Sequence, residues 1–430
     1  MMEMPAAAEP TERPAAGGKP RPTGPVRRSA LSVPNFRTYF VSACIAQCGG
    51  WLLRTAQAWL VLDLTGTPAA LAVVTIAQAL PVTILTLFAG ILIDRTQSRK
   101  LLVWVQIVIS LETALMAVLV LTQTVQYWHV VALAIILGTA SAIDFPTRAT
   151  IISELVEPVH VPNGVALNSA MNSAARIIGP GIGGLMIATW GSGVCFAVTA
   201  VVYASTTLGL LVLKGSDFYP KRLAHRAAIL GQLKEGLRYS FSTPVLAVNM
   251  LLAGFYGTFA YNWALVLPLM ARFALDAGSE GFGALNMAMG IGSTVGAFLL
   301  ATRVRASLRL LLISAATFGS AMLILSLAPN LPVALVLLVG TGILSVLFNA
   351  TNNTLLQVEA REDIRGRVLS LYTFLMIGST PVGGAFTGFI ANELSVRTAL
   401  QMNGSICLIG LLASALFLRR RLRRGESPRE

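Results

Sequence analysis

Four ionisable residues lie inside apolar stretches in the first half of the chain: Arg54, Glu112, Asp144 and Arg176. An ionised side chain is costly in hydrocarbon, so such residues usually face other protein groups or a water-filled path. A carboxylate in this position can accept a proton from one side of a membrane and release it to the other, as its surroundings change. The residue types therefore indicate proton or ion handling within a membrane bundle.

No other chemistry is indicated. His129, His160 and His225 are scattered, and the four cysteines have neither metal-ligand nor disulfide-framework spacing. The sequence has no nucleophile and base pattern and no phosphate-binding loop. We therefore expect no metal, no cofactor, no enzymatic activity and no direct use of ATP.

The two carboxylates each leave two interpretations open. Asp144 and Arg148 are four residues apart and share a helix face, so they form either a structural ion pair or a carboxylate that alternates between Arg148 and a proton. Glu112 is about twelve residues into its span, near the bilayer centre, and either carries a proton or bonds to a neighbouring helix. We rank Asp144 ahead of Glu112 for proton coupling.

The two embedded arginines are also open to interpretation. Arg54 lies toward the outer end of the first span, where it either extends to the membrane surface or attracts an anionic substrate. Arg176 lies near mid-depth, where it either pairs with Asp144 or Glu112 or binds substrate.

The elements that position these residues are membrane spans. The chain has 430 residues, of which 55% are hydrophobic and 12% charged, and its mean hydropathy is +0.72, which excludes an ordinary soluble globule. Runs long enough to cross about 30 Å of hydrocarbon as helices are predicted at 38–62, 68–93, 101–121, 129–148, 163–188, 194–213, 244–270, 281–301, 308–328, 332–354, 367–390 and 398–418. The sequence thus predicts an all-α membrane protein with twelve transmembrane helices.

The basic residues predict the orientation. The net charge of +13 arises mainly in the tails and in the connections on one side of the predicted bundle, which leaves no basic face for a nucleic acid. Both termini are therefore expected in the cytoplasm, in a multi-pass protein of the cell membrane. The predicted parts are a disordered tail 1–35, a six-helix half 36–213, a linker 214–243 with an amphipathic helix on the anionic leaflet, a second half 244–418 and a basic tail 419–430.

The two halves resemble one another. SAIDFPTRATIISELV at 141–156 aligns with SVLFNATNNTLLQVE at 345–359, and GPGIGG at 179–184 parallels STPVGG at 379–384. Such a repeat predicts two pseudo-symmetric halves that move against one another in alternating access. Gly179, Gly183 and Gly184 let another backbone approach, and Pro180 bends the helix, which is typical of an interface between helices.

Two motifs carry a resemblance to a known superfamily. Gly90, Asp94, Arg95 and Arg99 fit the loop pattern G-x-x-x-D-R-x-x-R, and ARIIGPGIGG resembles the antiporter motif G-x-x-x-G-P-x-x-G-G with Ala175 in place of the first glycine. The first half resembles the transmembrane secretion effector branch of the major facilitator superfamily, which includes enterobactin-exporter-like and macrolide-efflux-like proteins. The resemblance is strong over about 35–213 and rests on topology beyond it.

The resemblance implies a central cavity lined by spans one, four, seven and ten, and an interface between the halves made by spans two, five, eight and eleven. The candidates for the cavity are then Arg54, Gln57, Asp144, Tyr256, Asn262, Asn349 and Asn353. The helix-interface motif comprises Gly90, Arg176, Gly179, Pro180, Gly183 and Gly184. For Asp94, Arg95, Arg99, Arg148 and Glu154 the favoured interpretation is a cytoplasmic gate of ion pairs, against ordinary solvated loop charges for those in the connections.

The predicted function is proton-coupled efflux of an amphipathic small molecule, such as a drug, a macrolide or a siderophore, by a monomer in the lipid bilayer. Two alternatives stay open: a small-solute importer, and a membrane sensor or assembly partner that uses a transport fold. The antiporter-type motif weighs against import, and the lack of a large soluble domain weighs against sensing.

Overall fold

The structure is a computed structural model that describes residues 29–213, 219, 229–303, 306–362 and 364–423. Within these ranges the side chains of 86–91, 94, 229–235, 301–303 and 422–423 are not described. The predicted tail 1–35 falls mostly outside the described residues. Its last part does not, because a short helix η1 (Ala30–Ser32) packs on the first half and Ala30 is fully buried.

The first half is built from α1 (Pro34–Thr65), α2 (Pro68–Arg95), α3 (Ser98–Leu121), α4 (Tyr127–Leu155) and α5 (Val161–Val212). The helix α5 contains two crossings, because Gly191 has φ +80° and reverses the chain without a loop. Few residues other than glycine adopt this backbone conformation. The predicted fifth and sixth spans therefore join at a single residue.

A short helix, α6 (Ile229–Ser242), precedes the second half and lies beside α12 (Arg365–Thr373). The second half comprises α7 (Pro244–Phe259), α8 (Trp263–Leu269), η3 (Met270–Ala274), α9 (Gly278–Arg303), α10 (Leu308–Ser326), α11 (Leu331–Glu359), α12 (Arg365–Thr373), η4 (Phe374–Gly378), α13 (Thr380–Glu393) and α14 (Val396–Arg423). Its seventh span is broken between α7 and α8, and its eleventh contains the π-helical turn η4.

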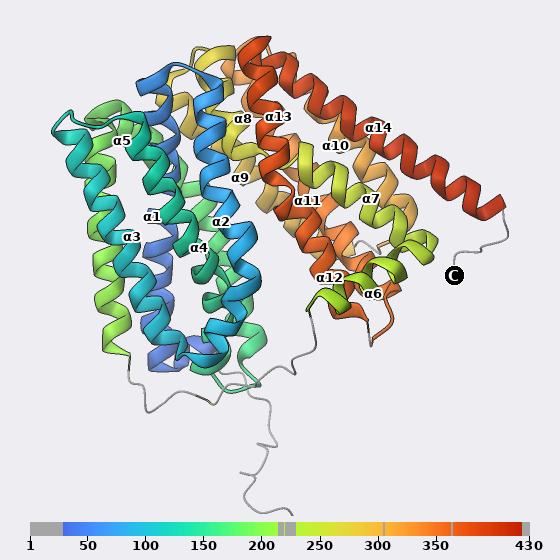
Figure 1. The fold of residues 1–430 in the computed structure, drawn as a ribbon, viewed down its shortest axis with the longest axis horizontal. Coiled ribbons are helices and arrows are strands. Elements are labelled where there is room, and N and C mark those ends of the chain that lie inside the picture. Colours follow the sequence, from blue (N-terminus) through green and yellow to red (C-terminus); the bar gives the residue numbers. More distant parts are fainter. Residues whose placement is uncertain (1–28, 214–218, 220–228, 304–305, 363, 424–430) are drawn as a thin grey trace, which may run out of the picture.

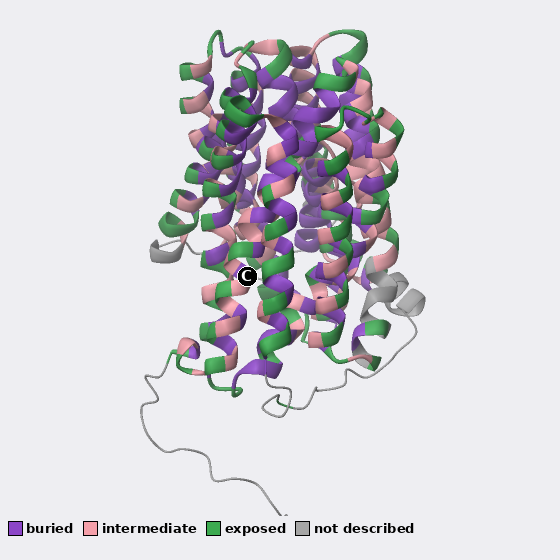
Figure 2. Cartoon of the chain, turned by 90° about the vertical axis from the view of Figure 1, so that its left-hand side faces the viewer, coloured by how far each residue is buried: buried purple, intermediate pink, exposed green. Residues whose placement is uncertain are grey.

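Ten helical segments of the described chain are long and apolar enough to cross a membrane. The two crossings of α5 count as one of them, and α1, which carries charged side chains, completes twelve. Figure 2 shows exposed residues around the outside of the bundle. Many of the exposed residues carry large apolar side chains, for example Trp104, Leu111 and Phe298 at 67%, 66% and 73% exposure. Such a surface suits contact with lipid, so the prediction of a twelve-helix membrane protein is confirmed.

The halves contact one another mainly through two helix pairs, α5 with α9 and α2 with α13, and α8 makes further contacts with α1 and α2. We call the end of the bundle where α1 begins and α5 ends the linker end, and the opposite end the far end. Figure 1 shows the ribbons of the two halves meeting at the far end, near α8 and α13, and diverging toward the linker end.

Candidate functional site

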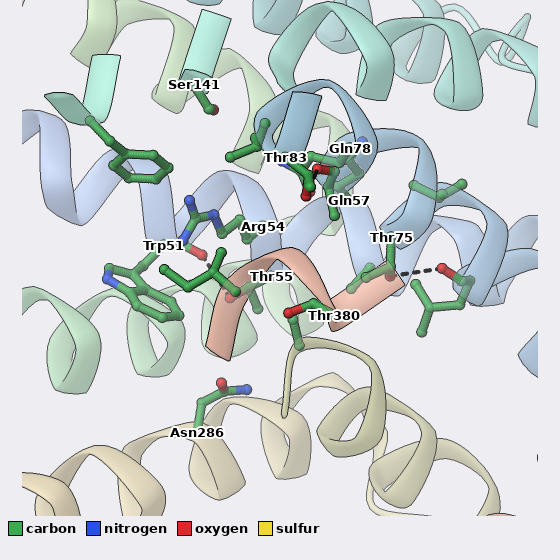
Figure 3. A pocket seen from close by; sticks show the side chains of 18 of the residues that line it. Trp51, Arg54, Thr55, Gln57, Thr75, Gln78, Thr83, Ser141, Asn286 and Thr380 are labelled. Carbon is green, nitrogen blue, oxygen red and sulfur yellow. Dashed lines mark hydrogen bonds between the residues drawn. The ribbon is translucent and has the colours of Figure 1, made fainter. Parts of the chain in front are cut away.

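Two adjoining cavities lie in the middle of the bundle. The inter-half cavity, of about 330 Å³, is lined by α1, α2 and α4 of the first half and by α8, α9, η4 and α13 of the second (Figure 3). The N-half cavity, of about 360 Å³, is lined by α1 to α5. The two share Trp51, Arg54, Gln78, Ser141 and Phe145, so they form one continuous central site.

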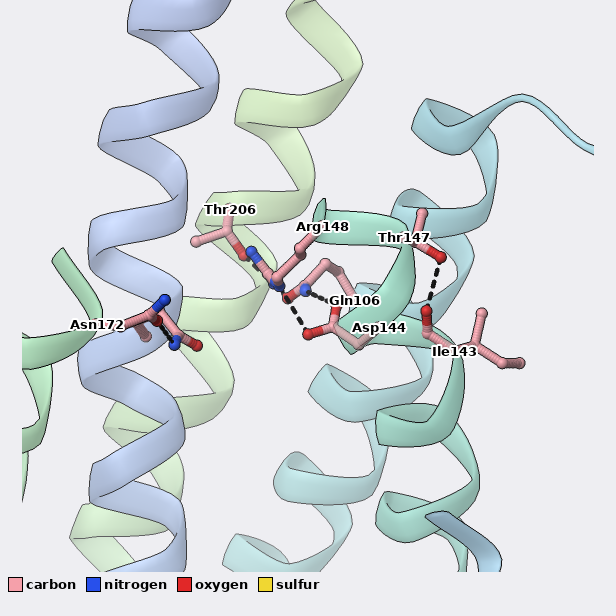
Figure 4. A network of polar contacts seen from close by, with 8 residues as sticks. Gln106, Ile143, Asp144, Thr147, Arg148, Asn172 and Thr206 are labelled. Atoms are coloured by element: carbon pink, nitrogen blue, oxygen red, sulfur yellow. Dashed lines mark hydrogen bonds and ion pairs between the residues drawn. The ribbon is translucent and has the colours of Figure 1, made fainter. Parts of the chain in front are cut away.

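A polar network lies on the wall of the N-half cavity (Figure 4). The Nε of Arg148 donates to Oδ2 of Asp144 at 2.7 Å, and each side chain is 12% exposed. Nε2 of Gln106 donates to the other carboxylate oxygen at 3.3 Å, and Thr206 donates to Oε1 of Gln106 at 3.3 Å. Asp144 and Arg148 thus form the expected ion pair, which loss of the carboxylate charge would break.

Glu112 lies elsewhere. It is buried, with 4% exposure, and does not line either cavity. Oε2 accepts a bond from Thr113 at 3.1 Å, and Oε1 has no partner in the described structure. This carboxyl group therefore has no described contact with the space that a substrate would occupy.

Both embedded arginines face the central site. Arg54 lines both cavities and Arg176 lines the N-half cavity. Each guanidinium carbon lies over the ring of Trp51, at 5.4 Å for Arg54 and 5.8 Å for Arg176. Arg176 therefore does not pair with Asp144 or Glu112 in this structure.

Gln57 also lines the inter-half cavity, and its Nε2 has no partner in the described structure. Tyr256 is not among the residues that line either described cavity. Its ring is fully buried against Phe318 and Phe348, and its hydroxyl donates to the carbonyl of Ala315 at 2.6 Å.

The three asparagines of the second half are likewise absent from the described cavity walls. Asn262 begins α8 at the break in span seven, where its Nδ2 donates to the carbonyl of Thr258 at 2.5 Å and satisfies a group that the break frees. Asn353 accepts from Gln357 at 2.5 Å, and the carbonyl of Asn349 accepts from Tyr372 at 3.5 Å. These three asparagines therefore form their hydrogen bonds with other residues of the second half.

Two of the gate candidates, Arg99 and Glu154, contact other residues of the first half. Arg99 donates to the carbonyls of Leu210 and Leu211 at 2.9 and 2.5 Å, where it caps the end of α5. Glu154 is buried and accepts from Ser98 at 2.7 Å, and Arg95 is exposed. The side chain of Asp94 and the surroundings of Gly90 lie outside what the structure describes. The halves diverge at the linker end (Figure 1), so ion pairs between the halves would not close this end in this conformation.

The glycines of α5 serve two different contacts. A Cβ on Gly179 would meet Trp51 of α1, and one on Gly183 would meet Thr55 of α1 at 3.2 Å, so these two pack within the first half. A Cβ on Gly184 would instead lie 2.5 Å from the carbonyl of Ser279 at the start of α9. Gly184, rather than Gly183, makes the close approach between halves, because successive residues of a helix point about 100° apart.

An ion pair joins the halves at the far end. Arg272 of η3 and Asp63 of α1 are 3.7 Å apart, and both side chains are more than 40% exposed. The guanidinium of Arg272 also lies 5.5 Å from the ring of Trp59, which stacks on Phe282 of α9. The far end is thus closed by contacts that cross from one half to the other.

Sequence reasoning missed several polar residues of the inter-half cavity: Thr55, Thr75, Gln78, Asn286 and Thr380. Gln78 and Asn286 are amides within apolar spans, which is the signal that could have identified them. The threonines give no such signal, because Thr55 and Thr75 satisfy their hydroxyls on carbonyls of their own helices.

Comparison with solved structures identifies the fold. The chain superposes on a variant of the nucleoside transporter NupG with a TM-score of 0.72 and 15% identity, covering 89% of this chain and 99% of that one. A bacterial homologue of the human lysosomal transporter Spinster gives a TM-score of 0.69 at 15% identity, with 91% and 98% covered. The architecture is that of the major facilitator superfamily.

Comparison of sequences identifies the branch. The chain is 28% identical to the multidrug efflux pump Tap of Mycolicibacterium fortuitum over 402 residues, covering 90% of this chain and 97% of Tap. It is 23% identical to the staphyloferrin A transporter of Staphylococcus aureus, with 86% and 93% covered. Residues 27–429 match the family described as transmembrane secretion effectors. This match spans nearly the whole chain, so the protein is a major facilitator superfamily transporter of the transmembrane secretion effector family.

Proposed function

We propose that this transporter exports an amphipathic small molecule across the cell membrane, driven by inward movement of protons. The observation that carries the proposal is the inter-half cavity, which both halves line and which adjoins the Asp144 and Arg148 pair. Its wall is largely apolar with a few polar groups, which suits a ligand with an apolar body and a polar head. The similarity to an efflux pump supports export as the direction.

We place the linker end in the cytoplasm, because the tails and the 214–243 connection there are rich in Lys and Arg. In this orientation the far end is closed to the outside by the Asp63 and Arg272 contact. The halves diverge toward the cytoplasm, where an exported compound would be taken up.

We assign proton coupling to Asp144. A proton on this carboxyl group would remove the ion pair and release Arg148 toward the N-half cavity, so the two protonation states present different charges to a ligand. Glu112 has no such connection to the cavity.

The test is accumulation of fluorescent amphipathic compounds by inverted membrane vesicles, with and without an imposed pH gradient. Asp144→Asn keeps the shape but cannot ionise, so it should lose gradient-driven accumulation and keep exchange of substrate down its own gradient. Glu112→Gln is the matched control and should retain both. Loss in Glu112→Gln with retention in Asp144→Asn would move the coupling site to Glu112. Wild-type accumulation that ignores the pH gradient would refute proton coupling.

A further inference from the structure

Two positively charged side chains of the central site form no ion pair among the described residues. Arg54 and Arg176 lie over the same indole, that of Trp51, and both are exposed although they lie deep within the bundle. Like charges on one ring repel each other, and protein walls screen this repulsion less than bulk water does. A ligand with a negative charge would relieve the repulsion.

The lining of the cavities carries an excess of positive charge. Asp144 is the one carboxylate among the residues that line the two described cavities. It already forms an ion pair with Arg148, with 2.7 Å between Oδ2 and Nε. Three guanidinium groups and one carboxylate face this space, which leaves Arg54 and Arg176 uncompensated. A cleft lined by one sign of charge with low-dielectric walls concentrates ligands of the opposite sign.

We propose that Arg54, Trp51 and Arg176 form a subsite for the negatively charged head of an organic anion, and that the inter-half cavity holds its apolar body. Guanidinium groups bind carboxylates through charge-assisted hydrogen bonds, and stacking on an aromatic ring restricts their orientation. The apolar residues Leu71, Val74 and Phe282 line the adjoining space. Figure 3 shows Arg54 and Trp51 in this cavity together with Asn286 of α9 and Thr380 of α13. The proposal rests on the proposed export function only in treating the bound anion as a substrate.

The test measures binding without transport. Purified full-length protein in detergent is titrated with three fluorescent probes that share one aromatic body: dansylglycine with a carboxylate, neutral dansylamide, and dansylcadaverine with an ammonium group. Wild type should bind dansylglycine about tenfold more tightly than dansylamide, as expected for charged hydrogen bonds. Dansylcadaverine should bind most weakly.

Arg54→Gln and Arg176→Gln should each reduce the preference for dansylglycine, and the double variant should abolish it. All three should still bind dansylamide, which shows that the cavity is folded. Arg309→Gln removes the same charge from an exposed position outside the cavities and should leave the preference unchanged. Equal binding of the three probes by wild type, or a preference that persists in the double variant, would overturn the subsite.

Vesicle transport separates this proposal from the export function. If the protein binds dansylglycine selectively through the two arginines but inverted vesicles accumulate no substrate, the export function is refuted and the anion subsite is supported. If inverted vesicles accumulate neutral or cationic compounds and the protein shows no preference for dansylglycine, the export function is supported and the anion subsite is refuted.

Discussion

Gln57 and Tyr256 are both polar residues in apolar spans, yet their surroundings differ at the scale of the single residue. Gln57 lines the inter-half cavity with Nε2 unpartnered in the described structure. The hydroxyl of Tyr256 is bonded to a carbonyl of α10, and its ring is 4.5 Å from that of Phe348. An unpartnered polar atom on a residue that lines a cavity can be satisfied by a ligand if the side chain turns toward it, whereas a satisfied group in the core contributes to folding.

Tyr256→Phe should therefore leave transport unchanged and cost about 1 kcal/mol of stability, the usual value of one hydrogen bond. Gln57→Leu should do the reverse: it keeps most of the buried volume but removes the amide, so it should raise the KM for transport with little change in thermal unfolding. Both are measured by vesicle transport and by the unfolding temperature of the purified protein. Loss of transport in Tyr256→Phe at unchanged stability would return that residue to the substrate path.

At the scale of the element, α5 uses its two faces for different partners. Gly179 and Gly183 are four residues apart and face α1, while Gly181 and Gly184 face α9. The first contact lies within the first half, so it would stay intact if the halves rock against one another. The second must break and re-form if the far end opens.

Gly184→Ala should consequently impair transport by weakening closure of the far end, because its Cβ would meet backbone atoms of α9 that cannot rotate away. Overpacking of this kind commonly costs about 1–3 kcal/mol. Gly340→Ala is the control, since nothing lies within 4 Å of its added Cβ. Vesicle transport at matched protein levels decides the case, and normal transport in Gly184→Ala would show that the two helices do not need this close approach.

The spans could be predicted from apolar length alone, but the side chains that face the cavity could not be predicted as fully. Arg54 and Asp144 were identifiable because charge at membrane depth needs a polar environment. The local role of Asn262 could not be predicted, because it depends on the break in span seven, where its side chain bonds to a carbonyl. The roles of Gly183 and Gly184 were not separable, since one residue changes the helix face and the sequence does not give the rotation of a helix.

At the scale of the whole molecule, few polar contacts among the described residues join the halves at the far end. Asp63 and Arg272 are exposed, so their attraction is screened by water, and pairs of this kind contribute less than about 1 kcal/mol. The contact of Arg272 with Trp59 adds a similar amount. A balance between two conformations is sensitive to terms of this size.

Arg272→Gln should shift the population toward a state open at the far end by about fivefold, the change that roughly 1 kcal/mol produces. Spin labels at Thr67 and Glu280, which are exposed on opposite halves of the far end, should report a longer distance in part of the molecules. Cys44 and Cys48 are partly accessible and are replaced beforehand. An unchanged distance distribution would show that apolar contacts alone keep the far end closed.

The proposed orientation predicts a labelling pattern in intact cells. A membrane-impermeant thiol reagent should modify Glu280→Cys at the far end but not Glu362→Cys near the linker end, both positions being exposed. Ser279 is unsuitable because it is buried against α5. Labelling of Glu362→Cys but not of Glu280→Cys would show that the far end faces the cytoplasm, which is the opposite of the proposed orientation.

The uncompensated guanidinium groups of Arg54 and Arg176 have an electrical consequence. An anion that leaves the cytoplasm moves with the inside-negative voltage of the cell, which contributes about 2.3 kcal/mol per charge for each 100 mV. An outgoing anion and an incoming proton carry current in the same direction, so the voltage assists both. A potassium diffusion potential that makes the interior of inverted vesicles positive should therefore increase accumulation of an anionic substrate even at equal pH on both sides.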